Sequence, residues 1–405
     1  MESSMSRRRI RFGAFIPPHH VPTIQNPTYS LQRDLEIAQL MDSLGFEEAW
    51  FGEHHSCGVE PLGDPLLMMA HVAAQTKYIK VASGVLSLPY HNPLWVADSI
   101  VQLDHLTRGR IIIGLGPGAL STDANQIGIV AAEQRDALEV DTGVLMHLLT
   151  NDEPISIETP RYKLVEARLQ LDSYTNPHPE IATAAIVSPS GPRLAGRYDL
   201  GMISIGATAA GGFDAVAHHW GTLEEQAALY GHTPDRNRWR LVAPFHIAAT
   251  KDQAIKDVSQ GGLDAWCDYL QHTASTPQMK VEGETTKERI EWVIESGVGV
   301  IGTYDEAIEQ IERLWEQSNG GFGCMLLFDH NWAPWAAKRE HYHLFANLVM
   351  PHFQGTLNRL QKNEAWTRSV REELTAQNWK AIEDFSAKHA DEVAAREAAR
   401  KPKGT

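Results

Sequence analysis

The 405-residue sequence has few cysteines and no long hydrophobic run. Cys57, Cys267 and Cys324 are far apart, and no CxxC pair or zinc-ligand spacing occurs. This excludes a disulfide-stapled scaffold and favours a reducing cytoplasm. No stretch approaches the roughly 20 apolar residues of a membrane span, and the apolar run 10–18 is too soon interrupted for a signal peptide. We therefore expect a cytoplasmic location.

Basic charge is also scarce. The 36 lysines and arginines face 51 acidic residues, which gives a net charge of −15. A chain this acidic, without a basic cluster, is not expected to bind nucleic acid or an anionic membrane. These partners are excluded from the hypotheses below.

A dinucleotide fingerprint, GxGxxG after the first strand, is missing as well. The nearest match is Gly114-Leu-Gly-Pro-Gly118, which follows a later predicted strand. A lone GxGxG is a weak signal, and a tight turn after the strand explains it equally well. The sequence therefore gives no indication of a nicotinamide site.

What the sequence does contain is a regular alternation of apolar strand-like runs with segments of helical spacing. Alternation of this kind predicts parallel βα units, and eight of them suggest a closed (β/α)8 TIM barrel over residues 9–355. An open doubly wound sheet is the structural alternative. The strands are expected at 10–16, 47–52, 79–88, 110–115, 180–187, 200–205, 240–248 and 323–328, and the helices at 31–44, 64–76, 93–106, 133–149, 192–198, 213–230 and 305–317.

Three segments do not fit the barrel. Residues 154–164 indicate a small hairpin. Residues 251–303, with the polar stretch 275–287, are interpreted as a long insertion at the barrel mouth, typical of a mobile lid. Residues 356–405 are charged and helix-prone. They predict a C-terminal helical extension that packs on the barrel or on a partner subunit, with a solvated tail as the alternative.

The most informative stretch is Ala49–Gly58, AWFGEHHSCG. Its aromatic start predicts a buried strand, and Glu53, His54 and His55 follow at the strand's carboxyl end, where α/β proteins place their chemistry. A surface loop or a hydrogen-bonded core histidine would give the same letters. Neighbouring residues on an extended segment point to opposite faces, and the HExxH spacing is absent, so no metal site is predicted.

This GEHH stretch resembles the flavin-dependent, bacterial luciferase-like monooxygenases. Further stretches between residues 9 and 350 match in the same order, and within the family the sequence is most similar to the limonene 1,2-monooxygenase group. These stretches are Val81–Pro93, Leu103–Arg110 followed by Gly114–Gly118, Ser188–Arg197 and Val300–Ala307.

The resemblance implies an oxidoreductase that uses reduced FMN, with FAD possible, and O2. It implies insertion of one oxygen atom into a small apolar molecule, reduced flavin from a separate NAD(P)H:flavin reductase, and a homodimer. Deazaflavin-dependent hydride transfer on the same fold is the alternative, and a degenerate flavin-binding relative is a third. Epoxidation, Baeyer–Villiger insertion and aldehyde oxidation are not separated by the sequence.

The resemblance also implies a set of cofactor-binding residues. A non-prolyl cis bond is expected between Gly84 and Val85, with Gly84 small enough for the flavin ring to approach. A phosphate needs N–H donors and hydroxyls at a helix N-terminus, and helix capping is the other role for such serines. Where some members carry a phosphate-pairing arginine this sequence has Pro117. Either Arg193 or Arg197 substitutes for it, or neutral donors hold the phosphate. The other cofactor-binding candidates are His91, Asn92, Gly116, Ser188, Ser190 and Gly191.

The catalytic candidates are His54 and Glu53. The resemblance implies that His54 donates a hydrogen bond or moves a proton near neutral pH when reduced flavin reacts with oxygen. Glu53 is expected to orient its imidazole. An apolar substrate pocket, or alternatively core packing, is predicted for the aromatic residues near strand ends, which are Trp50, Phe51, Tyr90, Trp332 and Trp335.

Overall fold

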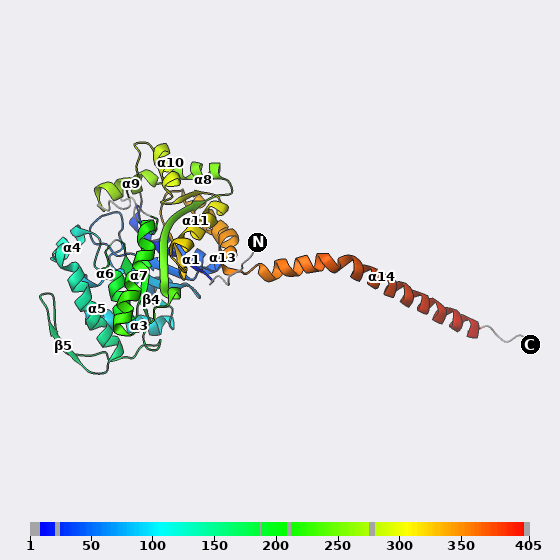
Figure 1. The fold of residues 1–405 in the computed structure, drawn as a ribbon, viewed down its shortest axis with the longest axis horizontal. Helices are drawn as coiled ribbons and strands as arrows, with labels where there is room; N and C mark the ends of the chain where they lie inside the picture. The colour runs from blue at the N-terminus through cyan, green and yellow to red at the C-terminus, as the bar shows by residue number, and fades with distance from the viewer. Residues whose placement is uncertain (1–8, 21–24, 187, 209–211, 275–279, 401–405) are drawn as a thin grey trace, which may run out of the picture. The chain divides into compact units, whose positions relative to one another are not determined.

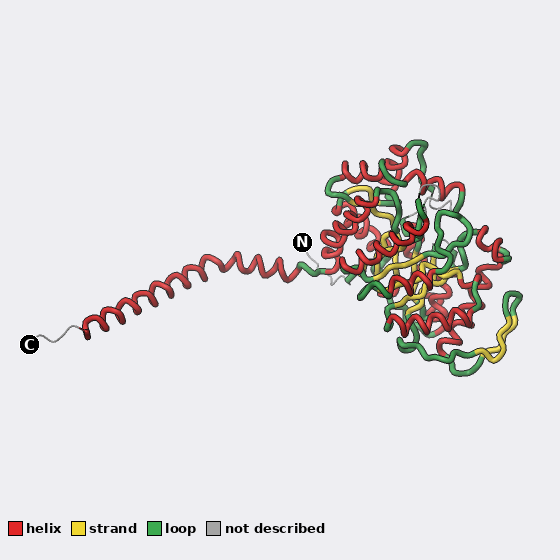
Figure 2. The backbone as a smooth tube through the Cα atoms, turned by 180° about the vertical axis from the view of Figure 1, so that it is seen from behind, coloured by secondary structure: helices red, strands yellow, loops and turns green. Residues whose placement is uncertain are grey.

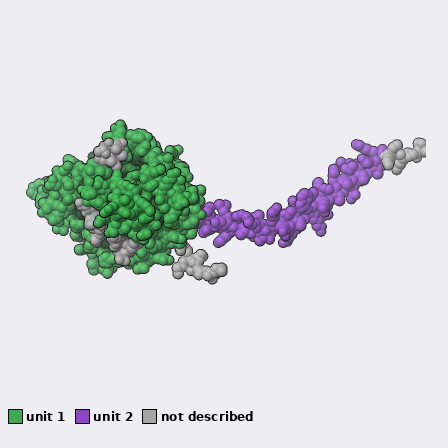
Figure 3. All heavy atoms as spheres, turned by 90° about the horizontal axis from the view of Figure 1, so that it is seen from above, with its two compact units in different colours: residues 1–354 green, residues 355–405 purple. Residues whose placement is uncertain are grey.

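The computed structural model describes residues 9–20, 25–186, 188–208, 212–274 and 280–400 (Figure 1). The chain forms two compact units, one ending at Gln354 and one beginning at Gly355, which Figure 3 shows in different colours. The first unit carries all strands among the described residues. It therefore contains everything on which the candidate site is built.

Eight parallel strands close into a barrel in the order β1, β2, β3, β4, β7, β8, β9, β11, with β11 pairing back to β1. Figure 2 shows the strands enclosed by helices. The prediction of a closed (β/α)8 barrel is confirmed, and each predicted strand agrees to within two residues of its observed bounds. These bounds are β1 Arg11–Ile16, β2 Glu48–Phe51, β3 Lys80–Ser87, β4 Ile111–Gly116, β7 Glu180–Ala185, β8 Gly201–Ser204, β9 Trp239–Ile247 and β11 Cys324–Phe328. The predicted end of the fifth strand, Val187, lies outside the described residues.

The helices begin and end where local chemistry favours it. Asn26 accepts a hydrogen bond from the Thr28 N–H at 3.0 Å and starts α1, and Gly45 ends that helix with φ +84°. Asp64 caps α2 in the same way. Each of these helices has proline at its first position, where the missing N–H costs nothing. The helices around the barrel are α1 Pro27–Leu44, α2 Pro65–Ala73, α3 Pro93–Thr107, α4 Ser121–Ile127, α5 Gln134–Thr150, α6 Ser190–Tyr198, α7 Gly212–Tyr230, α11 Tyr304–Gln317, α12 Trp335–Leu344 and α13 Met350–Gln354.

Apolar side chains form two separate cores. One lies between the strands and the outer helices, and the other fills the inside of the barrel, with Phe15, Trp50 and Ile112 among its members. The inner core continues into the segment after β9, through Trp266 and Leu270. The barrel is thus packed inside, as expected for eight strands, and is not a pore.

A charged layer closes the amino end of the barrel. Glu48, fully buried, accepts hydrogen bonds from Arg240 at 2.9 and 3.0 Å, from Arg11 at 2.6 Å and from the Trp50 indole at 2.9 Å. Arg240 also pairs with Glu180 at 2.6 Å. Burial favours the neutral carboxyl, but the two guanidinium groups outweigh it and lower the pKa of Glu48 to about 2. Two carboxylates balance two guanidinium groups, so this layer is electrically neutral.

The stretch 251–303 corrects the prediction of a long loop. Its described part forms α8 Lys251–Ser259, α9 Leu263–His272, α10 Thr286–Ser296 and the short strand β10 Val300–Gly302, which pairs with β9. Figure 1 shows the three helices grouped together. Apolar residues at helical spacing turn inward and are buried with the inner core. A segment that buries a face of this kind is a packed insertion.

Two further elements lie outside the barrel's βα units. The predicted hairpin is present as β5 Ile155–Glu158 and β6 Lys163–Ala167, which pair antiparallel. The second unit carries α14 Asn358–Arg400, a helix without a buried residue. Within the described chain, no helix combines the length and the apolar character needed to cross a bilayer.

Candidate functional site

The predicted site residues gather at one end of the barrel. Glu53 and His54 follow the carboxyl end of β2, Gly116 is the last residue of β4, and Ser188 follows β7. Because all eight strands are parallel, these ends share one rim. Gly84 lies inside β3, beside a register shift between Ser83 and Leu86, and its peptide bond to Val85 is cis. The expected cis bond is thereby present.

The side chain of His54 is held between two carboxylates. Its Nδ1 lies 3.0 Å from Oδ2 of Asp123, and its Nε2 lies 2.8 Å from Oε2 of Glu60. The contact with Glu60 is an ion pair without an aligned hydrogen bond. Each ring nitrogen faces a carboxylate, and this arrangement favours the doubly protonated imidazolium.

The charge state of His54 corrects one expectation. Burial opposes the cation, but Glu60 and Asp123 outweigh burial and raise the pKa of His54 to about 10. An imidazolium that keeps its proton at neutral pH is a hydrogen-bond donor and a fixed positive charge. The expectation that His54 changes protonation near pH 7 is wrong, because it was based on an isolated imidazole.

The role expected for Glu53 is also corrected. Its Oε1 lies 2.9 Å from Nε2 of His55 and 2.6 Å from Nε2 of His91, and its Oε2 accepts the backbone N–H of Ser87 at 2.6 Å. These bonds outweigh burial and lower the pKa of the Glu53 carboxyl. Glu53 thus orients His55 and His91, and Asp123 and Glu60 orient His54.

Glycines at the rim serve the packing of the protein itself. A Cβ on Gly84 would lie 2.9 Å from the Cβ of Trp50, and a Cβ on Gly116 would lie 2.4 Å from Cγ2 of Val85. Gly84 therefore makes room for Trp50, and the approach of a flavin ring to Gly84 stays a prediction. Val85, half-buried, covers Gly116. Whether the Val85 side chain contacts a cofactor stays a prediction.

The loop before α6 presents the donor set that a phosphate requires. The Ser188 hydroxyl accepts the N–H of Ser190 at 3.3 Å and lies 3.1 Å from the Ser190 hydroxyl. Gly191 is packed so tightly on β7 that an added Cβ would lie 2.0 Å from the Ala184 carbonyl oxygen. Both serines are half-buried. Ser188 thus stabilises the turn before α6, whose N-cap residue is Pro189, and the two hydroxyls and the helix N-terminus together suit an anion.

Two other predicted contacts have structural partners. Asn92 caps α3, because its Oδ1 accepts the Leu94 N–H at 3.0 Å. Arg197 pairs with Glu139 at 2.6 Å and is partly exposed. Arg193 is exposed on α6. A flavin contact for Asn92, Arg193 or Arg197 stays a prediction.

The aromatic residues proposed for a substrate pocket divide into two groups. Phe51 packs in the outer core, and Trp335 lies against Arg33 in a cation–π contact on α12. Trp50 and Trp332 are fully buried in the inner core. For Phe51, Trp50 and Trp332, core packing is the correct interpretation, whereas Trp335 is only partly buried. Tyr90, whose ring centroid lies 5.9 Å from that of His55, stays beside the carboxyl ends of the strands.

Sequence reasoning missed Glu60 and Asp123. Asp123 accepts the His55 backbone N–H at 3.0 Å and the Ser56 hydroxyl at 2.5 Å, besides its bond to His54. These pairs are separated by more than 60 residues, and no periodic pattern in the sequence signals them. Among the described residues no group of histidine, cysteine and acidic side chains is arranged to hold a metal ion.

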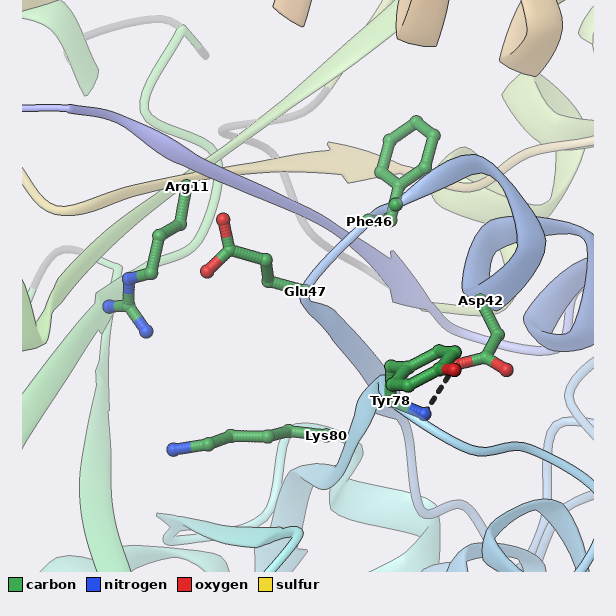
Figure 4. A pocket seen from close by; sticks show the side chains of 7 residues that line it. Arg11, Asp42, Phe46, Glu47, Tyr78 and Lys80 are labelled. Carbon is green, nitrogen blue, oxygen red and sulfur yellow. Dashed lines mark hydrogen bonds between the residues drawn. The ribbon is translucent and has the colours of Figure 1, made fainter. Parts of the chain in front are cut away.

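A cavity of about 270 Å³ lies at the opposite, amino end of the barrel (Figure 4). Arg11, Glu47, Tyr78 and Lys80 are among its lining residues, and Asp42 accepts the Tyr78 backbone N–H at 2.8 Å. Its walls come from the starts of strands and carry both signs of charge. In a TIM barrel this end supports stability, and the loops at the other end carry the active site.

The structure is a closed (β/α)8 barrel with a polar cluster at its carboxyl rim, and comparison with known proteins identifies its family. The model of the luciferase-like monooxygenases matches residues 10–320. Limonene 1,2-monooxygenase of Rhodococcus erythropolis is 41% identical over 351 residues, 86% of this chain and 88% of the relative. The 4-hydroxyprotoasukamycin monooxygenase of Streptomyces nodosus subsp. asukaensis is 37% identical over 374 residues, which are 91% of this chain and 98% of the relative. The chain belongs to the luciferase-like monooxygenase family and is an enzyme.

Solved structures agree with this fold. The oxygenating constituent of 3,6-diketocamphane monooxygenase of Pseudomonas putida, a type II Baeyer–Villiger monooxygenase solved with FMN, superposes with a TM-score of 0.70. It is 24% identical, and the match covers 85% of this chain and 98% of that one. An F420-dependent secondary alcohol dehydrogenase gives a TM-score of 0.63 at 17% identity, and the match covers 84% of this chain and 98% of that one. The fold is thus shared by flavin and deazaflavin enzymes.

Proposed function

We propose that the protein is a two-component flavin monooxygenase that inserts one atom of O2 into a small apolar organic molecule. The observation that carries this proposal is the pairing of His54 with Asp123 and Glu60 at the carboxyl rim of a luciferase-like barrel. The serine-lined N-terminus of α6 lies at the same rim. The monooxygenase relatives at 41% and 37% identity support it. FAD in place of FMN is the less favoured cofactor.

The described residues fit a flavin phosphate at α6. Ser188, Ser190 and the Gly191 N–H would hold it, because a helix N-terminus with two hydroxyls offers neutral donors to an anion. When bound, the reduced flavin supplies the two electrons needed to cleave O2, so that one oxygen atom reaches the substrate and the other becomes water. Everything else in the reaction falls to the protein's own side chains.

His54 holds protons at both ring nitrogens, and each of them faces a carboxylate, Asp123 or Glu60. The imidazolium therefore ties the loop after β2 to α4 and fixes the shape of the rim beside the site. Glu53 binds His55 and His91 and keeps their Nε2 protons directed at itself. His91, which is partly exposed, is the candidate for contact with the flavin edge.

A separate reductase and a homodimer complete the proposal. The sequence carries no nicotinamide fingerprint, which supports delivery of reduced flavin from another protein. Association into dimers is tested by sedimentation at several protein concentrations. A concentration-independent monomer would remove the dimer from the proposal.

The function is tested by product analysis over a panel of terpenes, cyclic ketones and aldehydes, with a generic flavin reductase, FMN and 18O2. We expect one 18O atom in the product. A parallel reaction with reduced deazaflavin and no oxygen separates the alternative. Substrate reduction by the deazaflavin, without label incorporation by the FMN system, would replace oxygenation by hydride transfer.

A further inference from the structure

The β5–β6 hairpin lies outside the barrel's βα units, but its turn is built with a fixed shape. The Thr159 hydroxyl oxygen accepts the N–H of Arg161 at 3.2 Å and the N–H of Tyr162 at 3.1 Å. Pro160 presets the backbone of such a turn. Leu164 of β6 is buried in the outer core and anchors the hairpin. The position from which the Arg161 side chain starts is therefore well defined.

Arg161 joins the hairpin to two other elements at once. Its guanidinium donates to both carboxylate oxygens of Asp141 on α5, at 2.6 and 2.7 Å. Its Nη1 also donates to the Pro89 carbonyl at 3.0 Å. Asp141 is fully buried and accepts the Tyr162 hydroxyl at 2.7 Å as well. A bidentate pair with a carboxylate fixes the plane of the guanidinium, so the bond to Pro89 has one direction.

Pro89 belongs to the short turn that follows β3 at the carboxyl rim. This turn is η1 Leu88–Tyr90, and the His91 N–H closes it on the Leu88 carbonyl at 3.0 Å. The Nε2 of His91 lies 2.6 Å from Oε1 of Glu53. The carbonyl that Arg161 holds is thus two residues away from a histidine of the candidate site.

A second bond from α5 acts beside the first. The Gln134 side-chain amide donates to the Tyr90 hydroxyl oxygen at 2.7 Å. The fit is tight, because a Cβ on Gly118 would lie 2.1 Å from that oxygen. Helix α5 therefore holds η1 at two places, at the Tyr90 side chain directly and at the Pro89 backbone through Arg161.

We propose that Arg161 is a positioning residue that holds η1 by the Pro89 carbonyl and so sets where His91 meets Glu53. The positioning itself is independent of the reaction. Its consequence for flavin binding rests on the proposed function, in which His91 is the candidate contact with the flavin edge. Glu53 is held separately by the Ser87 N–H at 2.6 Å, so a shift of η1 moves His91 relative to its carboxylate. A hydrogen bond as short as theirs weakens steeply with such a displacement.

Arginine suits this position because one side chain must serve a carboxylate and a carbonyl together. The lysine ammonium is a compact charge without the planar fork, so Arg161→Lys should keep an ion pair with Asp141 and lose the bond to Pro89. Tyr162→Phe is the matched control. It removes one hydrogen bond to the same Asp141 from the same turn, and it keeps the aromatic ring that lies 5.4 Å from the Arg161 guanidinium.

The experiment is a long-range 1H–15N NMR comparison of histidine-labelled full-length protein, with the His91 signals assigned from His91→Gln. Arg161→Lys is expected to shift the Nε2 resonance of His91, because the bond to Glu53 weakens. It should also weaken binding of reduced FMN by about 3–10-fold, the scale of one lost hydrogen bond. Tyr162→Phe should leave both the resonance and the affinity unchanged, although each variant loses one hydrogen bond of the hairpin.

An unchanged His91 resonance in Arg161→Lys, or an equal shift in Tyr162→Phe, would overturn the proposal. A shifted resonance with wild-type affinity for reduced FMN would support the positioning and remove His91 from the flavin site. Weakened binding with an unchanged His91 resonance would refute the positioning and leave the proposed function in place. Oxygen labelling with the wild-type protein tests that function separately.

Discussion

The two ends of the barrel each bury a network of charges, but the networks are built differently. At the amino end, Glu48 and Glu180 are balanced by Arg11 and Arg240, whose guanidinium groups keep their protons at every physiological pH. At the carboxyl end, histidines take the place of the guanidinium groups and face three carboxylates, Glu53, Glu60 and Asp123. The first network is permanent, and the second depends on imidazole protonation.

This difference teaches where chemistry can occur. A guanidinium pair can hold strands together, but it neither gives up a proton nor responds to a ligand near neutral pH. Imidazoles can do both when their partners change. The cavity in Figure 4 lies at the amino end, where the buried charges are of the permanent kind.

The largest expected effect breaks the amino-end network. Arg240→Ala leaves Glu48 buried without its main partner and should lower the free energy of unfolding by about 3–5 kcal/mol. Denaturant unfolding measures this loss. His54→Ala is the comparison at the other end, where Asp123 keeps two hydrogen bonds, and a loss of about 1–2 kcal/mol is expected. Equal losses would mean that both networks are structural.

The next effect concerns the anion site at α6. Ser188→Ala combined with Ser190→Ala removes two hydroxyls and should weaken binding of reduced FMN by about 1–3 kcal/mol. Anaerobic titration measures the affinity. Thr150→Ala, which removes a hydroxyl bonded to the Met146 carbonyl on α5, is the control and should bind as wild type. Unaltered affinity in the double variant would leave the serines with their role in the turn before α6 alone.

The smallest effect is a pH dependence that separates the two ends. The folded-state pKa of His54 is raised to about 10, so its stabilisation is complete below 6.5 and is lost as pH rises towards 10. The pKa of Glu48 is lowered to about 2, so its contribution is complete above 4.5 and is lost as pH falls towards 2. The stability difference between wild type and His54→Gln should therefore shrink by about 1 kcal/mol or more between pH 7 and pH 10. A constant difference would show that His54 is not charged in the folded protein.

The barrel itself could be predicted because its signals are local. Three consecutive isoleucines before Gly114 and the run Glu48–Phe51 are buried strands in the structure, as their composition suggests. Helix α9 was missed although Leu263, Trp266 and Leu270 have helical spacing, because the polar residues that follow favoured a loop. The role of its apolar face is evident only in the folded structure, where that face packs in the inner core.

The position of the candidate site could be predicted from the sequence, but the hydrogen-bond partners of its residues could not. The GEHH stretch located Glu53 and His54, because a polar group after a buried strand lies at the rim of a parallel barrel. Asp123 comes from another loop, and its pairing with His54 across more than 60 residues leaves no trace in a single sequence. Glu60 lies on the same loop as His54, but its place in the chain does not show that it faces the imidazole. Glu53 was expected to orient His54 because the two residues are adjacent in the sequence. In the structure its side chain bonds to His91 instead.

The measurement that tests the central claim most directly is the ratio of oxygenated product to hydrogen peroxide in His54→Ala beside Lys80→Ala, one variant at each end of the barrel. We expect His54→Ala to bind reduced FMN and consume oxygen but to form roughly 10²-fold less product, with peroxide in its place. His55→Ala should lose less, and Lys80→Ala should match wild type. Wild-type coupling in His54→Ala, or a comparable loss in Lys80→Ala, would contradict the assignment of the chemistry to the carboxyl end.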